Sequence, residues 1–402
     1  MTGDGHSVMS FRPAIAMSKF IQVFNPYLKS GGEESSATRI ATHLELGGHT
    51  VVRFWRSSRE WSGPGAPSRF RQPFLMWNNV AVLNELRKLH SRENPQAWIL
   101  HNVVPVISLG VYRLAGELNA PIIQWLHNYR PISPSGTLQA GGRMLRPDDS
   151  WLVWKEILAG SWRGRFLTGW LAWGYARIRK RSDFSSVRAW IAVSDEMREI
   201  FLRAGWPKER TFTLRHSWDV QRLSELNKDA GYFLYLGRMT ETKGVRFLLE
   251  LWRHPSLEDV SLVMAGDGPL YSELKDEFRN VNWAGYVHGE EKQRLIAGCR
   301  AIVFPSLWPE PLSTVAYEAY EMGKPILSSS VGGMKELVFE RETGRLLPPC
   351  DSEKWLNAVR ELAQRPDLAQ RWGRAGREWL ETNVSRARWN RQFSVILEKV
   401  LA

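Results

Sequence analysis

Hydrophobic and polar positions in the first half of the chain follow the pattern of strands that alternate with helices. Residues 19–24 are predicted to form a buried strand, residues 31–32 a glycine loop, and residues 33–46 an amphipathic helix. A glycine pair ends this helix, and a second strand follows at residues 50–54. Further apolar runs predict core strands at residues 97–100, 121–126 and 189–193. This alternation is typical of a parallel sheet covered by helices on both faces.

The same rhythm restarts after Asp229. Strands are predicted at residues 232–236, 261–265, 301–304, 325–328 and 345–347, and helices at 244–252, 269–278, 312–322 and from 351 onward. We therefore predict an α/β protein with two doubly wound parallel-sheet domains. They are expected at residues 1–225 and 226–384, with a C-terminal helix at about 385–402 that packs back on the first. Ligands of such sheets bind at the carboxyl ends of the strands, so the site is expected in the cleft between the domains.

The composition agrees with two soluble domains. A chain of 402 residues, 43% of them hydrophobic, supplies more apolar material than one compact core normally absorbs. Cys299 and Cys350 are too few for a disulfide framework, so we expect reduced thiols in a cytoplasmic protein. The N-terminal residues lack the pattern of a secretory signal. The best candidate for a membrane span, residues 98–112, is interrupted by polar side chains and a proline, so none is expected.

The net charge of +12 lies entirely in residues 1–220, which hold 29 basic and 17 acidic residues. This asymmetry indicates that the first half faces something anionic. The densest stretch, residues 143–181, interleaves nine basic side chains with tryptophans spaced as on an amphipathic helix: Trp151, Trp154, Trp162, Trp170 and Trp173. One interpretation is a helix on an anionic membrane surface. Another is a helix that packs its Trp stripe into the core. Nucleic acid is a third partner class, although no motif for reading it accompanies the patch.

Two loops after predicted strands carry features suited to a phosphate. Arg238 and Lys243 lie beside the N-terminus of a predicted helix, where free amides also favour an anion, so together they can bind a diphosphate. The alternative is that both are solvated loop charges. The turn at residues 266–269, which contains Gly268, lets backbone approach a ligand, although strand–turn–helix joints use Gly and Pro in any case.

The pair Glu310 and Glu318 is the most informative feature. Glu310 is predicted in a loop and Glu318 two turns into the following helix, which places the carboxylates roughly 12 Å apart along the axis. That separation suits the two ends of an extended ligand, with its phosphates over the helix N-terminus at Ser313 and Thr314. The alternative is a carboxylate at a helix start and a solvated helical glutamate. The pair is too far apart to be the acid and nucleophile of a glycoside hydrolase.

The loop at residues 237–244, the turn at 266–269 and the two glutamates resemble family 4 retaining glycosyltransferases of the two-Rossmann-domain (GT-B) fold. The loop with Gly31 and Gly32 and the histidine His127 fit the same pattern. The likeness is strong over residues 231–347 and patchy before them, and it is specific to the family but not to a sugar. Ser313 stands where the family often has Gly, but it still supplies its amide.

The resemblance implies a nucleotide-diphospho-sugar donor held mainly by the second domain. Arg238 and Lys243 would clamp the phosphates and neutralise charge on the departing diphosphate. The remaining donor-binding residues would be the amides of Gly32, Ser313 and Thr314, the turn at Gly268, the backbone of Val287 for the base, Glu318 for the ribose and Glu310 for the transferred sugar. His127 would reach the sugar near the reacting centre, and otherwise it is a structural loop histidine.

The implied activity is that of a retaining hexosyltransferase, which acts by positioning and charge stabilisation, without a protein nucleophile. No Asp-x-Asp follows a strand and no Cys or His cluster has zinc spacing, so we expect no metal and no cofactor beyond the co-substrate. The acceptor is expected to be a carbohydrate or a lipid-linked glycan for a surface polysaccharide, bound by the first domain at the inner membrane face. The alternatives are a non-catalytic homologue that binds nucleotide-sugars and a basic nucleic-acid-binding protein; we expect no nucleic acid partner.

Overall fold

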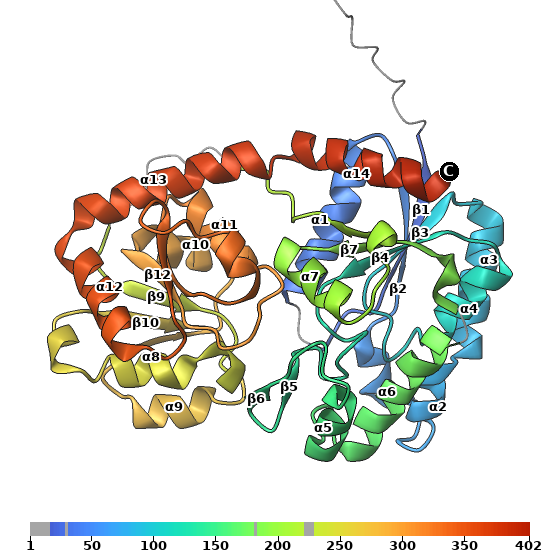
Figure 1. Cartoon of the computed structure of the whole chain (residues 1–402), viewed down its shortest axis with the longest axis horizontal. Coiled ribbons are helices and arrows are strands. Elements are labelled where there is room, and N and C mark those ends of the chain that lie inside the picture. Colours follow the sequence, from blue (N-terminus) through green and yellow to red (C-terminus); the bar gives the residue numbers. More distant parts are fainter. Residues whose placement is uncertain (1–16, 29–30, 181–182, 221–228) are drawn as a thin grey trace, which may run out of the picture.

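The computed structural model describes residues 17–28, 31–180, 183–220 and 229–402, which form two lobes side by side (Figure 1). Each lobe contains one six-stranded parallel sheet with helices around it, as the alternating pattern predicts. The boundary expected at residues 225 and 226 lies outside the described residues.

The first lobe is built on a sheet of order β2-β1-β3-β4-β7-β8. Its strands are β1 (Lys19–Phe24), β2 (Thr50–Trp55), β3 (Ala97–Leu100), β4 (Ile122–Leu126), β7 (Val187–Ala192) and β8 (Thr211–Thr213). Its helices are α1 (Gly32–Leu46), α2 (Gln72–Trp77), α3 (Val80–Glu93), α4 (Gly110–Glu117), α5 (Leu152–Ala159), α6 (Arg165–Lys180) and α7 (Asp195–Arg203). The central strands β3 and β4 are buried at every position, which explains why they are continuous apolar runs in the sequence.

The second lobe repeats the architecture with the order β11-β10-β9-β12-β13-β14. Its strands are β9 (Phe233–Leu236), β10 (Leu262–Ala265), β11 (Asn282–Gly285), β12 (Ala301–Phe304), β13 (Ile326–Ser329) and β14 (Gly344–Leu347). Its helices are α8 (Val245–Leu251), α9 (Tyr271–Glu277), α10 (Gly289–Gly298), α11 (Thr314–Glu321), α12 (Ser352–Gln364) and α13 (Pro366–Asn383). The chain reverses its strand order at β9 and β12, so the loops after these strands lie at a switch point where ligands bind.

Four strands are absent from the sequence prediction: β5 (Gln139–Ala140), β6 (Arg143–Met144), β8 and β11. β8 and β11 are the edge strands of their sheets, and both are short. The positions in β11 are exposed or only half-buried, so they lack the apolar run that marks an interior strand.

The last helix links the lobes. After α13 the chain passes to α14 (Arg386–Leu401), which crosses from the second lobe to the first along the same side of the molecule (Figure 1). α14 packs against α1 and β7, and Trp389 and Phe393 stack on each other with centroids 5.3 Å apart. Both rings also stack on Trp125 of β4, at 6.2 and 5.9 Å. Burial of each such side chain contributes about 1.5–3 kcal/mol, which holds the C-terminus on the first lobe.

The basic, Trp-rich stretch at residues 143–181 does not form one amphipathic helix. It begins in a hairpin of β5 (Gln139–Ala140) and β6 (Arg143–Met144) and continues as α5 and α6, with a turn between them. Gly160 and Gly164 in this turn have positive φ angles of 63° and 96°, conformations that end a helix and interrupt the spacing on which the single-helix prediction relied. Arg181 lies outside the described residues.

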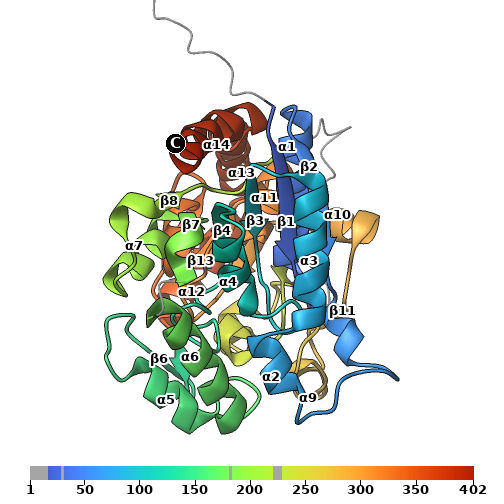
Figure 2. The same ribbon diagram turned by 90° about the vertical axis from the view of Figure 1, so that its right-hand side faces the viewer.

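The tryptophans of this stretch do not enter the core as a stripe. Trp151, Trp154 and Trp173 are 65%, 58% and 44% exposed, while Trp162 and Trp170 are half-buried. α5, α6 and α2 lie together at one end of the first lobe in both views (Figures 1 and 2). The interpretation that the stripe packs inside is therefore wrong for three of the five tryptophans.

Candidate functional site

Residues from both lobes meet where the loop after β1 faces the start of α11. A Cβ atom built on Gly32 would lie 3.9 Å from the Thr314 hydroxyl oxygen, so the Gly32 backbone lies close to the Thr314 side chain across the lobes. Ser313, which precedes Thr314, is a buried N-cap that makes no side-chain capping bond. The first amides of α11 consequently lack a side-chain partner at this position.

Glu310 is held by three donors that all bind one of its carboxylate oxygens. The Lys243 ammonium lies 2.5 Å from Oε1, the Ser306 hydroxyl donates to the same atom at 2.6 Å, and the Trp308 indole N–H donates to it as well. The Glu310 side chain is 6% exposed. The alternative of a carboxylate in the first turn of a helix is wrong, because α11 begins four residues later, at Thr314.

Close backbone packing brings the Lys243 and Glu310 loops together. At Gly244, which follows Lys243 and has φ of +66°, a Cβ atom would lie 2.0 Å from the Pro305 carbonyl oxygen. A similar clash excludes a side chain at Gly268, whose Cβ atom would lie 2.4 Å from the Met239 carbonyl oxygen. The glycines predicted to admit a ligand thus also let one loop pack on the next. Arg238 lies exposed in this layer, and its carbonyl accepts a bond of 2.7 Å from the Tyr235 hydroxyl.

Glu318 is an ion-paired and largely buried side chain, not a solvated helical residue. Its Oε1 atom lies 2.9 Å from the Lys292 ammonium of α10, and its side chain is 19% exposed. Its second oxygen, Oε2, is buried without a hydrogen-bond partner. On the first lobe, Nη1 of Arg39 is also buried without a partner, and the charge of Glu318 acts to raise the pKa of Arg39 against the lowering effect of burial. Burial of such groups is costly unless a ligand completes their bonds.

His127, predicted as a single loop histidine, is the middle ring of three. Its Nε2 atom lies 2.8 Å from Nδ1 of His101, and its ring stacks between those of His101 and His216 with centroids at 5.0 and 6.4 Å. Burial lowers the pKa of His127 to about 3, and burial and a neighbouring ring lower the pKa values of His101 and His216 as well. All three imidazoles are therefore neutral at physiological pH.

The hydrogen-bond chain also fixes which nitrogen of His127 carries its proton. The Trp55 indole N–H donates to Oε1 of Gln22, so the Gln22 amide nitrogen must donate to Nε2 of His101. Nδ1 of His101 then carries the proton and donates to Nε2 of His127. The remaining ring nitrogen of His127, Nδ1, is consequently an N–H donor. His127 can donate a hydrogen bond to a ligand oxygen but cannot act as a base through that atom.

A half-buried polar cluster adjoins His127 and was not predicted from the sequence. Glu33 accepts a bond of 3.2 Å from the Asn102 amide, and burial raises its pKa to about 7, although the Arg130 charge and the Tyr27 hydroxyl oppose the shift. Nε of Arg130 is buried without a hydrogen-bond partner. Glu33, His127 and Arg130 line one small cavity with Asn102, Asn128 and Tyr175. The cluster joins residues as far apart in the sequence as Glu33 and Tyr175, so no local motif predicts it.

Val287, the last of the predicted residues, is 6% exposed and packs its side chain into the hydrophobic core after β11. Only its backbone can therefore face a ligand. Within the described ranges no group of His, Cys, Asp and Glu side chains is arranged to hold a metal ion. Among the helices of those ranges, none has the length and apolar character that crossing a membrane requires.

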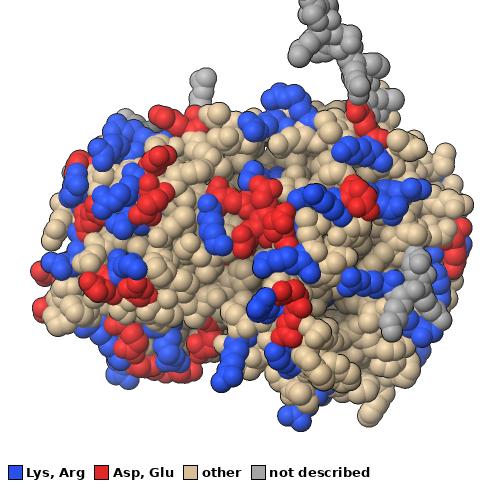
Figure 3. All heavy atoms as spheres, in the orientation of Figure 1, with Lys and Arg blue, Asp and Glu red and all other residues tan. Residues whose placement is uncertain are grey.

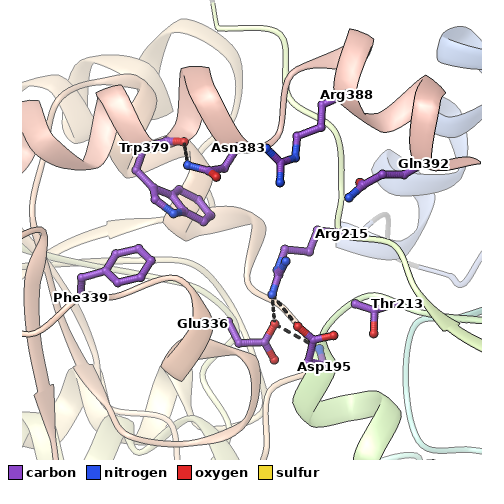
Figure 4. A pocket seen from close by; sticks show the side chains of 9 residues that line it. All are labelled: Asp195, Thr213, Arg215, Glu336, Phe339, Trp379, Asn383, Arg388 and Gln392. Carbon is purple, nitrogen blue, oxygen red and sulfur yellow. Dashed lines mark hydrogen bonds and ion pairs between the residues drawn. The ribbon is translucent and has the colours of Figure 1, made fainter. Parts of the chain in front are cut away.

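A second cavity, of about 410 Å³, lies between the lobes on the side of the crossing helices (Figure 4). The Glu336 carboxylate of the second lobe accepts bonds from the amides of Asp195 and Glu196 at the start of α7, at 3.1 and 2.7 Å. Arg215 bonds both Glu336 and Asp195, at 2.7 and 2.8 Å. We call this contact the hinge latch. None of the predicted site residues lines the cavity, so its size does not locate the site.

Known proteins resemble this chain in sequence. A family described as Glycosyl transferases group 1 matches residues 217–379. A D-rhamnosyltransferase, WbpZ of Pseudomonas aeruginosa, is 33% identical over 42% of this chain and 44% of its own, so this chain spans less than half of that relative. Glycogen synthase of Mycobacterium tuberculosis is 34% identical over 74% of this chain and 68% of its own.

Solved structures share the fold. HepE of Anabaena in complex with UDP-glucose superposes with a TM-score of 0.65 and 16% identity, over 95% of this chain and 99% of that one. The two-lobe fold of this chain therefore also occurs in a protein solved with UDP-glucose bound.

Proposed function

This chain belongs to the group 1 glycosyltransferases, and from that premise we propose that it transfers a hexose from a nucleotide-diphospho-sugar to an acceptor with retention at the anomeric carbon. The observation that carries the proposal is the pair of buried, unpartnered atoms, Oε2 of Glu318 and Nη1 of Arg39, on facing lobes. Native proteins leave few such groups unsatisfied, so a polar ligand between the lobes accounts for both.

The donor would lie along the second lobe. The diphosphate would replace Glu310 as the partner of the Lys243 ammonium and would also bind the exposed Arg238. The amides of Gly32, Ser313 and Thr314 would surround it. Glu318 would accept bonds from the ribose hydroxyls. The nucleotide base would meet the backbone at Val287, and the turn at Gly268 would allow the close approach.

The transferred sugar would bind between Glu310 and His127. Glu310, released from Lys243, would accept from sugar hydroxyls, while Nδ1–H of His127 would donate to a sugar oxygen. The acceptor hydroxyl oxygen would bond to the anomeric carbon as the bond to the diphosphate breaks on the same face. The diphosphate would leave with the electron pair and take the hydroxyl proton. Two cations and a helix N-terminus would stabilise its charge, so the step needs no metal ion.

The acceptor side belongs to the first lobe and to a membrane surface. Aromatic side chains in or next to α2, α5 and α6 are exposed at one end of this lobe, and we call them the aromatic face: Phe70, Phe74, Trp151, Trp154, Phe166 and Trp173. In Figure 3 this end of the lobe is largely free of charged side chains and has Lys and Arg at its edges. An exposed aromatic patch with basic neighbours suits anionic lipid at the inner membrane face. A lipid-linked glycan in surface polysaccharide synthesis is the acceptor class that fits this location.

The test is a thermal-shift panel of nucleoside diphosphates and their sugars on the purified chain. One base should raise the melting temperature, its sugar conjugate should act as the donor, and the product's anomeric coupling should match that of the donor. EDTA should leave the rate unchanged. If no nucleotide of the panel stabilises the protein, the proposal fails.

A further inference from the structure

An apolar groove runs between α5 and α6 on the first lobe. Its volume is about 430 Å³, within the range of small-molecule sites. We call it the α5–α6 groove; its walls include Ile132, Pro134, Leu152, Ala172 and Ala176. Leu152 and Ala172 are buried, whereas Ala176 is exposed at the groove's edge.

The groove shares part of its lining with the small cavity of the proposed reaction site. Arg130, Pro131 and Tyr175 line both the groove and the small cavity that contains His127 and Glu33. A ligand in the groove would therefore contact residues that also line the cavity of His127.

Arg130, which lines both cavities, is a cation with a donor that has no partner. The Arg130 guanidinium lies 5.8 and 5.7 Å from the ring centres of Tyr27 and Trp162. Its Nη1 makes a long bond of 3.5 Å to Asn102, and its Nε, as described above, is buried without a partner. Glu33 is the nearby acid, and its raised pKa leaves it substantially protonated near pH 7, so Arg130 retains charge for a second anion.

The other charged residues of the groove are already engaged. Asp149 pairs with Lys155 at 2.6 Å. Arg179 donates to the carbonyls of Ala204 and Gly205 and stacks on Trp206. Arg130 is therefore the cation of the groove best placed to take an anionic group.

The groove also meets the aromatic face. Val153, which lines it, is 36% exposed and lies on α5 between Trp151 and Trp154. An apolar chain leaving a bilayer at this face would thus reach the groove along α5.

We propose that the α5–α6 groove binds the apolar chain of a lipid-phosphate acceptor, with its phosphate on Arg130 and its acceptor hydroxyl toward His127. This inference rests on the proposed function and names the acceptor class for the same site. The groove supplies apolar contact, Arg130 supplies a planar set of donors for phosphate, and the lining that the two cavities share places the phosphate beside the proposed reaction site.

The test uses radiolabelled dodecyl phosphate below its micellar concentration, in equilibrium dialysis with the full chain. Dodecanol and inorganic phosphate serve as the two halves of the probe. Dodecyl phosphate should bind at least about tenfold more tightly than either half. Ala176→Trp, which fills the groove from its exposed edge, should weaken binding at least about tenfold. Arg130→Gln should reduce affinity toward that of dodecanol.

Ala81→Trp is the matched control, because Ala81 is an exposed alanine on α3 outside the groove. It should bind dodecyl phosphate like the unmodified protein. Equal affinity of Ala176→Trp and Ala81→Trp would overturn the proposal, and so would binding of dodecanol as tight as that of dodecyl phosphate.

Nucleotide binding, measured on the same variant, distinguishes this inference from the proposed function. The nucleoside diphosphate that stabilises the protein should stabilise Ala176→Trp equally. Nucleotide binding without binding of dodecyl phosphate would refute the groove alone. Binding of dodecyl phosphate without any nucleotide effect would leave the groove as a lipid-phosphate site and refute the transferase proposal.

Discussion

The two lobes share one sheet architecture, but their cleft-facing residues differ in charge. On the second lobe, opposite charges pair: Lys243 with Glu310 between two loops, and Lys292 of α10 with Glu318 of α11. On the first lobe, the site holds neutral imidazoles and a carboxyl with a raised pKa beside Arg130, and α5 and α6 carry exposed aromatic side chains. The second lobe is arranged to exchange its internal ion pairs for a charged ligand, whereas the first lobe offers neutral donors, the Arg130 cation and apolar surface.

The largest effect is expected at Glu310. Glu310→Gln should reduce kcat about 10²- to 10³-fold, because an amide cannot replace the carboxylate that would hold the sugar hydroxyls. The affinity for the nucleoside diphosphate should stay the same or increase, since Lys243 loses the carboxylate that competes with phosphate. Steady-state kinetics and calorimetric titration measure the two quantities.

Glu353→Gln, at an exposed position of α12, is the control and should change neither quantity. An equal loss of turnover and diphosphate affinity in Glu310→Gln would mean that this carboxylate acts on the whole site rather than on the sugar.

Lys243 should show the reverse pattern. Lys243→Gln removes a charge-assisted bond to the diphosphate, worth about 1.5–3 kcal/mol, so the Kd of the nucleoside diphosphate should rise about 10- to 100-fold. Lys354→Gln, whose side chain is 60% exposed on α12, should leave the Kd unchanged. If Lys243→Gln binds the diphosphate normally, the ion pair with Glu310 is structural and the contrast between the lobes loses its basis.

The same contrast explains what the sequence could predict. Arg238, Lys243 and Glu310 lie in loops that follow the strands β9 and β12, and Glu318 lies in the helix after the second of these loops, so strand pattern and spacing suffice to find them. Most interior strands were likewise predicted within two residues of their bounds, because burial on both faces leaves a continuous apolar run.

The first-lobe cluster could not be found in this way. Glu33, His101, His127 and His216 come together only through the tertiary fold, and each is unremarkable in its own segment. The partners of Glu310 and Glu318 were missed for a related reason: Ser306, Trp308 and Lys292 are ordinary residues until the backbone turns them inward. The single-helix prediction for residues 143–181 was wrong because the helical spacing of the tryptophans continues across a turn. In the sequence only Gly160 and Gly164 mark this turn.

A smaller effect is expected at the hinge latch, which holds the two lobes against each other. Glu336→Gln weakens three bonds to the amides of α7 and to Arg215 and should lower stability by about 2 kcal/mol. The KM values for donor and acceptor should both rise, because the lobes meet less often in the closed arrangement. Calorimetry and steady-state kinetics test this.

Asp367→Asn is the control, at a 74% exposed residue with a weak ion pair of 3.8 Å. It should change neither the stability nor the KM values. A change of KM for only one substrate would place Glu336 in that substrate's site instead of at the hinge.

The smallest effect is expected at Glu33 of the first lobe, where the stability of the protein depends on pH. The folded structure raises the pKa of Glu33 from its ordinary 4.5 to about 7, so the folded state binds a proton more tightly than the unfolded chain does. The stability this gives is complete below about pH 4.5 and is lost as the pH rises through 7. Glu33→Gln, which stays neutral, should therefore match the unmodified protein at pH 5 and exceed its stability by about 1 kcal/mol at pH 8. Denaturant unfolding at both pH values measures the difference. A constant difference across this range would show that Glu33 is ionised throughout, paired with Arg130, and would leave that cation no charge to offer an acceptor phosphate.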